Sequence, residues 1–507
     1  MKSRYLFVCS CIALITSAFT FVVRGDVFQA LGTAFDLTQE QKGGLEGAVF
    51  LGMAVSMAGG GFICDALGIK RIMILAFVSH LFGSLATILA PHFSDSTLNY
   101  YWLFSSSFLM GCGNGLTEVG INPLVATLYP TQKTHYLNIL HAWWPGGLVI
   151  GGISARLVGK GINLDFLGFP PISGMDLNWQ VSLCLIAAPA VVYGLMLIPA
   201  KFPATERVES GVTNREMYGQ LLRPMFLLWA FCMLLTAATE LGPQKWQESV
   251  MTSTTEGKVS GTIILVYTSG MMFVLRHFAG PIAHRLSPVG MLTGSAFLSG
   301  VGLYLLSFAH NPATAFGYAT IFGLGIAYFW PTMLGVAAER FPKGGALILA
   351  LMGTVGNISI SYVLPQMGKI ADHYNVSYVE SHKPELVDQL LKKDASGKPI
   401  ALNEKRLADL RDSAVQPSNA ASPEGAEPAL AMSPAQRDEL LQTAAAAERE
   451  GFSWAFRWVS ILPVVLVVLF GGIAFYDKSR GGYKPELIIS AKEERELFAG
   501  GVQAPVE

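Results

Sequence analysis

Apolar runs of about twenty residues or more recur along the chain and alternate with short polar joins. A run of this length, folded as an α-helix, crosses the hydrocarbon core of a bilayer. The pattern predicts twelve such helices, at 5–31, 43–64, 70–91, 100–128, 136–158, 179–200, 224–249, 259–283, 288–309, 313–338, 344–368 and 453–476. The first run also has the basic start of a signal peptide, but it is long enough to span, and we expect it to be a retained helix.

The polar stretch "KFPATERVESGVTNREMYGQLLRP" follows the sixth predicted helix and divides the chain into two sets of six. The fold class expected is therefore an all-α membrane protein, with twelve transmembrane helices in two pseudo-symmetric six-helix halves. The divisions are an N-terminal half at 1–200, a cytoplasmic linker at 201–223, a C-terminal half at 224–476 and a cytoplasmic tail at 477–507. A charged insertion at 372–452 interrupts the C-terminal half.

The insertion carries its own helix signals. "SPAQRDELLQTAAAAEREG" is expected to form a helix that Ser433 caps, Pro434 begins and Gly451 ends.

Composition agrees with a membrane protein and excludes several functions. The chain is 51% hydrophobic and 14% charged, whereas soluble domains are near 25% charged. A net charge of −1 makes nucleic acid an unexpected partner. The six cysteines have neither zinc-site nor disulfide-framework spacing, and no phosphate-binding loop, metal cluster or nucleophile–base pairing is found. We therefore expect no enzyme activity, no catalytic residue, no metal and no cofactor.

Lysine and arginine counts in the short joins predict the orientation. The joins on the side of the N-terminus are rich in these residues, whereas the opposite side has Lys42, Arg156, Lys160, Lys245 and Lys258. Both termini are therefore expected in the cytoplasm and the insertion outside.

A motif of small and charged residues lies between the second and third predicted helices, in "GFICDALGIKR". A glycine permits close helix packing, an acid stands at a helix end, and two cations follow a tight turn. The motif residues are Gly61, Asp65, Gly68, Lys70 and Arg71, with Arg285 in a degenerate copy in the second half. The motif resembles the signature loop of the major facilitator superfamily and would act as a cytoplasmic gate, with Asp65 and Arg71 as a charge latch. The alternative is an ordinary positive-inside loop.

One acid stands in the middle of the fourth predicted helix. Asn114, Glu118 and Asn122 are spaced i, i+4 and i+8, so they form a polar stripe on one helix face. A carboxyl group buried there is costly when charged, and taking up a proton removes that cost. Glu118 is therefore a candidate proton carrier; the alternative is a permanent ion pair, for example with Arg24.

The same region resembles the fucose:proton symporter family, which includes bacterial glucose/galactose transporters. The resemblance is carried by Glu118 followed by Asn122-Pro123, by Leu128-Tyr129-Pro130 and by Leu137-Asn138 with His141. It implies that Glu118 carries the proton and that the protein lies in a bacterial inner membrane. That family also has a substrate-linked acid on its first helix; the position falls on Gly25 here, so Asp26 takes the role only by a one-residue shift. The neighbouring Arg24 opens the possibility of an anionic substrate.

Further polar and aromatic residues within the spans are candidates for solute binding. Glu240 and Gln244 lie on one face of the seventh helix, and a pair between Glu240 and Arg276 is an equal alternative to solute contact. Trp143 and Trp330 are candidates to stack on a sugar ring, and simple core packing is an equal alternative for both. The substrate-binding set is completed by Asn114, Asn122, His141 and Arg24.

Together these features predict a monomeric secondary transporter that takes up a sugar with protons by alternating access. Its partners are the small-molecule solute, protons and the lipid bilayer. The alternatives are symport of a sugar acid or other organic anion, sodium coupling, or a transporter-like solute sensor.

Overall fold

Helices make up most of the chain in the computed structural model, which describes residues 2–35, 39–159, 161–162, 170–254, 261–394, 396–403, 406–407, 409–410 and 432–486. The N-terminal half contains α1 (Lys2–Ala34), α2 (Gln39–Leu67), α3 (Ile69–Ile88), α4 (Ser96–Leu128), α5 (Lys133–Val158) and α6 (Trp179–Leu197). Between α5 and α6, β1 (Gly161–Ile162) pairs antiparallel with β2 (Ile172–Ser173). Side-chain caps begin two of these helices: Asp95 accepts from the Thr97 N–H and Asn178 from the Val181 N–H.

The segment between the halves contains α7 (Glu206–Glu209), α8 (Asn214–Gly219) and the 3₁₀ turn η2 (Gln220–Leu222). The C-terminal half contains α9 (Pro224–Thr254), α10 (Gly261–His277), α11 (Ala279–Leu286), α12 (Pro288–Leu306), α13 (Pro312–Ile326), α14 (Phe329–Arg340), the 3₁₀ turn η3 (Pro342–Gly344), α15 (Gly345–His382), α18 (Pro434–Val459) and α19 (Ile461–Ser479). The eighth predicted helix is α10 and α11, the tenth is α13 and α14, and the twelfth is the end of α18 with α19.

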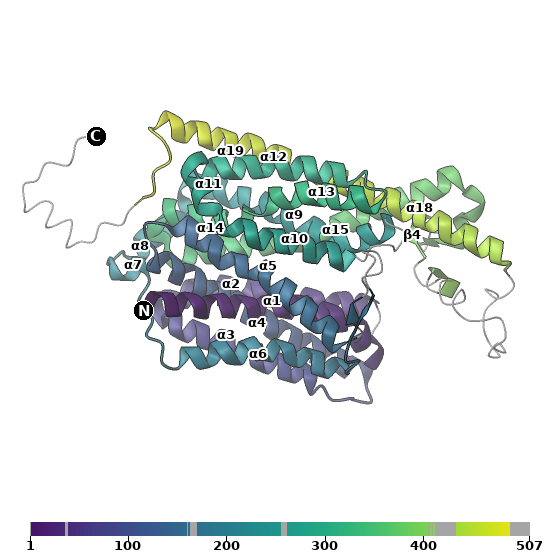
Figure 1. Ribbon diagram of the computed structural model, residues 1–507, viewed down its shortest axis with the longest axis horizontal. Helices are drawn as coiled ribbons and strands as arrows, with labels where there is room; N and C mark the ends of the chain where they lie inside the picture. The colour runs from purple at the N-terminus through teal and green to yellow at the C-terminus, as the bar shows by residue number, and fades with distance from the viewer. Residues whose placement is uncertain are drawn as a thin grey trace, which may run out of the picture.

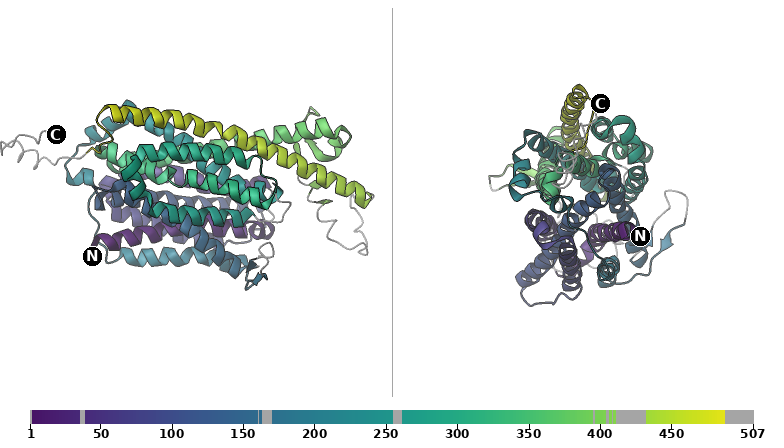
Figure 2. Two further views of the ribbon diagram at one scale, coloured as in Figure 1. Left: turned by 45° about the horizontal axis from the view of Figure 1, so that its top comes forward. Right: turned by 90° about the vertical axis from the view of Figure 1, so that its left-hand side faces the viewer.

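The helices run roughly parallel to one long axis, with the N-terminal half beneath the C-terminal half in Figure 1. Nine helices of the described ranges are long and apolar enough to cross a membrane by length and composition. Helices α4, α5 and α10 are not counted in these nine, but they run between them in the bundle. With these three, the bundle has the twelve-span arrangement that the sequence predicted. The end-on view in Figure 2 shows the two groups of helices facing each other.

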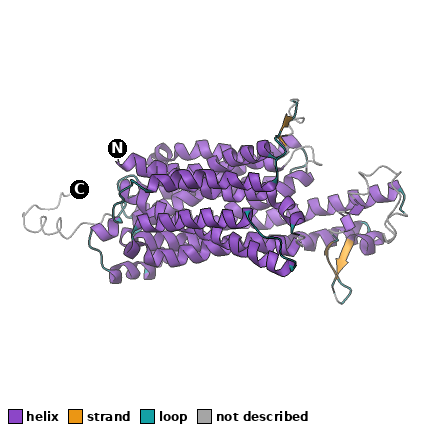
Figure 3. Ribbon diagram, turned by 90° about the horizontal axis from the view of Figure 1, so that it is seen from below, coloured by secondary structure: helices purple, strands orange, loops and turns teal. Residues whose placement is uncertain are grey.

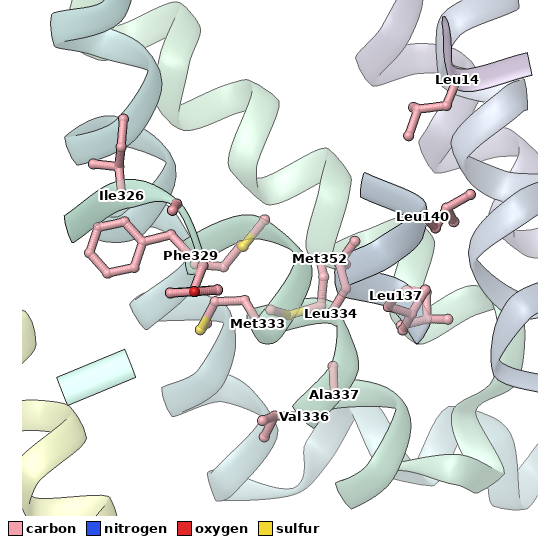
Figure 4. Packing of buried hydrophobic residues seen from close by; sticks show 14 of the residues in the cluster. Leu14, Leu137, Leu140, Ile326, Phe329, Met333, Leu334, Val336, Ala337 and Met352 are labelled. Carbon is pink, nitrogen blue, oxygen red and sulfur yellow. The ribbon is translucent and has the colours of Figure 1, made fainter. Parts of the chain in front are cut away.

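The two halves meet mainly where α5 contacts α10 and α14, and where α2 contacts α15. Small residues permit this approach: a Cβ added to Gly61 on α2 would lie 2.6 Å from the Ala350 Cβ, and one on Gly335 would lie 2.6 Å from the Thr134 Cα. Figure 4 shows the apolar part of the interface, with Leu137 on α5 beside α14 and α15.

Two ends of the bundle are distinguished below. The linker end holds Lys2, α7, α8 and the end of α19; the insertion end holds β1, β2 and the extension formed by α15 and α18 (Figures 1 and 3). The N-terminus and the last described residues therefore lie at the same end, opposite the insertion.

The insertion is built on two long helices. α15 continues past the predicted end of its span to His382 and packs along α18. Beside them lie the turn η4 (Pro384–Leu386), α16 (Val387–Leu390) and the antiparallel pair β3 (Leu391–Lys393) and β4 (Pro399–Leu402), around a small apolar cluster that includes Leu390, Leu402 and Leu440.

Ser433 caps α18 as predicted, but Gly451 does not end it. A Cβ on Gly451 would lie 2.5 Å from the Ala371 carbonyl oxygen on α15. The glycine therefore serves close packing of two helices, and the helix runs on to Val459.

Candidate functional site

A cavity of about 150 Å³ lies between the two halves. Its wall combines four aromatic residues with charged and amide groups from both halves. The lining residues are Phe21, Val22, Phe50, Met53, Glu118, His141, Trp144, Leu148, Glu240, Leu241, Gln244, Lys245, Leu265, Arg276, Trp330, Asn357 and Ile360. A concave, partly apolar cavity with a few convergent polar groups is the usual form of a small-molecule site.

The N-terminal half contributes a polar chain centred on Glu118. The Asn122 amide donates to Glu118 Oε2 at 2.7 Å, and its oxygen faces His141 Nε2 at 3.0 Å. Because the Asn122 nitrogen is committed to the carboxylate, its oxygen accepts and His141 Nε2 donates. Within the described ranges Glu118 has no lysine or arginine partner; the nearest basic nitrogen is His141 Nε2, at 3.7 Å. The permanent pair with Arg24 is not formed.

The C-terminal half contributes a buried pair of opposite charge. Arg276 Nη2 lies 3.2 Å from Glu240 Oε1, which is the pair that the sequence left open as an alternative to solute contact. Both residues also line the cavity, so the two possibilities are compatible. The second carboxylate oxygen of Glu240 is buried and has no hydrogen-bond partner among the described residues.

The other donors of Arg276 bind two backbone carbonyls that prolines leave free. Arg276 Nε donates to the Ala327 carbonyl at 2.6 Å, and Nη1 donates to the His141 carbonyl at 2.7 Å. Each carbonyl lies four residues before a proline, Pro331 or Pro145, which has no N–H to complete the helical hydrogen bond. The guanidinium therefore joins α10 to the break between α13 and α14 and, across the cavity, to α5 in the other half.

Lys245 lies on the insertion-end side of the cavity, against two rings of the N-terminal half. Its Nζ lies 5.0 Å from the ring centre of Phe21 and 5.9 Å from that of Phe50. The lysine and arginine pattern places Lys245 in an outer join and does not predict it as a site residue, whereas the structure places it inside α9, on the cavity wall. A charge within a predicted span was the available signal. Asn357 also lines the cavity, and the sequence did not predict it as a site residue.

Asn122 lies behind the cavity wall, against Glu118 and His141, and four other predicted site residues lie away from this cavity. Asn114 is fully buried and bonds to Thr20 and His80 inside the N-terminal half. Arg24 donates to Ser107 and lies 3.7 Å from Glu46. Asp26 pairs with Arg156 at 3.1 Å, and Trp143 packs on Phe273, whereas its neighbour Trp144 lines the cavity.

At the linker end, the expected latch between Asp65 and Arg71 is not formed. Asp65 instead accepts from Arg207 Nε at 2.6 Å and from the Thr205 hydroxyl at 2.7 Å, both in the linker. Arg71 donates to the Leu67 carbonyl. The sequence could not identify this partner because α7 is 140 residues away along the chain.

The other gate candidates have separate roles. Lys70 binds the Ile198 and Ala200 carbonyls at the end of α6, and Gly68 begins α3 with a φ of +83°, which favours glycine. Gly61 lies at the contact between α2 and α15. Arg285 is exposed on α11, without an ion pair to any described residue.

Contacts between the halves close the linker end. The Thr134 N–H donates to Glu339 Oε1 at 3.0 Å, and the Asn138 amide donates to the Thr332 hydroxyl at 3.1 Å. Tyr483, after α19, donates to the other oxygen of Glu339 at 2.5 Å. These bonds lie between the cavity and the linker, so the cavity is closed on that side.

A helical bundle with a cavity between two halves that holds a few charged groups, closed at one end by contacts between the halves, is typical of a membrane carrier for small molecules. The chain belongs to the Major Facilitator Superfamily, whose family model matches residues 6–363. It is therefore a secondary transporter and a multi-pass membrane protein.

Comparison with individual proteins gives a distant sequence relative. The chain is 24% identical over 343 residues to the cis,cis-muconate transport protein of Acinetobacter baylyi (strain ATCC 33305 / BD413 / ADP1), covering 64% of this chain and 77% of that protein.

Solved structures share the fold. A single-substitution variant of the E. coli fucose:proton symporter, FucP, has a TM-score of 0.61 and 14% identity, over 93% of this chain and 99% of that chain. A structure of FucP in the outward conformation has a TM-score of 0.60 and 17% identity, over 73% and 93%. The human organic anion transporter MFSD10 has a TM-score of 0.56 and 10% identity, over 93% and 100%.

Proposed function

We propose that the protein takes up a small organic anion together with a proton, with Glu118 as the proton site. The observation that carries the proposal is a cavity carboxyl group with an amide and a histidine as neighbours, and with no lysine or arginine partner in the described chain. A buried carboxylate without a cation is costly, and binding a proton removes the cost. Neutralisation of Glu118 would then permit the loaded carrier to change its conformation.

The charge balance of the cavity supports an anion over a neutral sugar. Its lining holds two acids, Glu118 and Glu240, and two cations, Lys245 and Arg276. When Glu118 is protonated, the lining carries one net positive charge, which a monoanion neutralises. The muconate relative, whose name indicates an organic acid as its solute, points the same way.

A hexose is the second candidate. The amide groups of Gln244 and Asn357 offer hydrogen bonds to hydroxyl groups, and Trp144 and Trp330 offer flat faces to a ring. These groups suit the ring of a sugar acid equally well. The charged part of the wall distinguishes the two solutes, and we therefore place the anion first.

The proposed direction is inward, across a bacterial inner membrane. If the linker end is cytoplasmic, as the lysine and arginine pattern predicts, then the contacts at Glu339 close the cytoplasmic side and the cavity faces outward. Under this proposal both termini are cytoplasmic, and the insertion lies outside beside the mouth of the cavity.

Uptake into proteoliposomes under two separate driving forces tests the proposal. One proton carried with one monoanion moves no net charge, so one pH unit is worth about 1.36 kcal/mol, or roughly tenfold accumulation, and voltage is worth nothing. One proton carried with a neutral sugar also responds to voltage, at about 2.3 kcal/mol, or roughly 50-fold, per 100 mV.

Galacturonate and galactose differ at one carbon and provide the matched pair of solutes. We expect galacturonate to accumulate under a pH gradient with the voltage clamped at zero, and not under voltage alone. Accumulation of galactose under both forces, with no uptake of galacturonate, would refute the anion and establish the sugar. A sodium gradient in place of the pH gradient tests the other coupling ion.

A further inference from the structure

Lys245 differs from the other buried or cavity-lining cations of the described chain because no described residue offers it a carboxylate partner. Arg276 donates to two carbonyls and to Glu240, and Arg24 lies beside Glu46. The Lys245 ammonium instead lies over ring faces, which hold a cation more weakly than a carboxylate does. Its charge is therefore available to an anion that enters the cavity.

The two rings fix the position of this cation. Phe21 and Phe50 pack edge to face, with ring centres 5.5 Å apart, and Phe21 also packs on Trp144 at 4.9 Å. The rings belong to α1, α2 and α5 of the N-terminal half, whereas Lys245 belongs to α9 of the C-terminal half. The ammonium is thus held over the cavity by groups on its opposite side.

A second unsatisfied group lies deeper on the same helix. Glu240 is part of the cavity wall, and its buried Oε2 has no hydrogen bond of good geometry to a described residue, although the Trp330 backbone N–H faces the carboxyl group. It precedes Lys245 by five residues, or about 7.5 Å along the helix axis at 1.5 Å per residue. A buried carboxylate oxygen of this kind accepts a hydrogen bond from a hydroxyl group.

We propose that Lys245 determines the specificity of the cavity for hydroxylated carboxylic acids of the sugar-acid type. Lys245 binds the carboxylate at the mouth, and a hydroxyl group at the other end of the solute donates to Glu240 Oε2. This inference rests on the proposed uptake of an organic anion and adds the solute class and the residue that selects it.

The same two groups disfavour other solutes. A neutral hexose leaves Lys245 on the rings, without an anion. A linear dicarboxylate such as cis,cis-muconate has no hydroxyl donor, and its second carboxylate would approach Glu240 and be repelled. The preferred solute therefore has one carboxylate, with hydroxyl groups at its other end.

The test uses the full-length protein in proteoliposomes and three probes: galacturonate, galactose and cis,cis-muconate. Lys245→Gln removes the charge and keeps a polar side chain, and Lys245→Arg keeps the charge. The control is Lys369→Gln, which removes a cation from the exposed surface of α15 outside the cavity wall. A melting temperature for each purified variant confirms that it is folded.

We expect Lys245→Gln to raise the KM for galacturonate by about 10- to 100-fold, the range for loss of a charge-assisted hydrogen bond, with a smaller change in maximal rate. Lys245→Arg should recover most of this loss, and Lys369→Gln should leave KM within about twofold of the unaltered protein. The unaltered protein should prefer galacturonate to cis,cis-muconate.

Two results would overturn the inference, and they are distinguishable. Uptake of galacturonate with an unchanged KM in folded Lys245→Gln would refute the role of Lys245 and leave anion uptake standing. A strong preference of the unaltered protein for cis,cis-muconate would refute the hydroxyl requirement, again without touching anion uptake. Uptake of galactose alone would refute the proposed function and the inference together.

Discussion

Replacing Glu118 with glutamine separates the proton from the rest of the carrier cycle. The carboxylate accepts from the Asn122 amide at 2.7 Å, and the oxygen of a glutamine can accept the same hydrogen bond. The hydrogen bond between Asn122 and His141 then also persists. Because shape and bonding are kept, Glu118→Gln is expected to fold and to resemble the carrier with its proton permanently bound.

The expected magnitude follows from the driving force. With one proton per solute, a gradient of one pH unit supports about 1.36 kcal/mol, or roughly tenfold accumulation. A carrier that cannot release its proton only equilibrates the solute, so the ratio for Glu118→Gln should be close to one. Exchange of labelled for unlabelled solute needs no proton movement and should stay within about threefold of the unaltered protein.

The assay measures accumulation under a pH gradient and exchange without one, in the same proteoliposomes. Glu46→Gln is a suitable control, because Glu46 lies beside Arg24 in the same half, outside the cavity wall, and should leave accumulation unchanged. Tenfold accumulation by Glu118→Gln would refute the assignment of the proton site. Loss of exchange together with accumulation would indicate a structural role instead.

Three further changes test other parts of the structure. Asp65→Asn removes the negative charge from the buried pair with Arg207 and should destabilise this contact by about 3–5 kcal/mol. The open fraction at the linker end should then increase in spin-label distance measurements; an unchanged distribution would contradict a role of the Asp65–Arg207 pair in holding this end closed. Pro145→Ala restores an N–H that competes with Arg276 for the His141 carbonyl, and should speed solute exchange by up to about tenfold. An unchanged exchange rate would contradict the idea that the Arg276 hydrogen bond holds the two halves together. A backbone amide and then a lysine lower the pKa of Glu216 to about 2, so its stabilising effect is present above about pH 4.5 and is lost only toward pH 2. Glu216→Gln should therefore leave the shape of the pH profile of uptake between pH 5 and 8 unchanged; a shifted profile contradicts this.

The sequence predicted the helices well because a membrane requires long, uninterrupted apolar runs. It predicted the ends of the helices less well where tertiary contacts determine whether a helix stops or continues. Gly451 has the sequence of a helix stop, yet it lies where α18 packs closely on α15, and the helix continues. Pro331 follows a real break in the tenth span, but the apolar run continues through it, so hydropathy gave one helix where the structure has α13 and α14.

The polar stripe on α4 shows why only part of the site could be predicted. Steps of four residues advance 400° around a helix, so each successive member of the stripe is rotated by about 40° from the last. Glu118 and Asn122 reach the cavity side and His141, whereas Asn114 is turned toward Thr20 and His80. The spacing of the residues alone does not show which member of such a stripe faces away from the cavity.

Arg276 links the two groups on which the proposed cycle depends. Through the His141 carbonyl it contacts the residue that bonds to Asn122, which in turn bonds to Glu118; through its Nη2 it contacts Glu240. The proposed proton site of one half and the proposed solute site of the other therefore share one guanidinium. The bond across the cavity goes to a backbone carbonyl, which is free because Pro145 supplies no N–H. A proline inside a predicted span thus marks a carbonyl four residues earlier that is open to a distant donor, and this signal could have identified both carbonyl partners of Arg276 from the sequence. Separation of the halves at this level must break that bond, so any conformational change that opens the linker end alters the surroundings of Glu240 as well as those of Glu118.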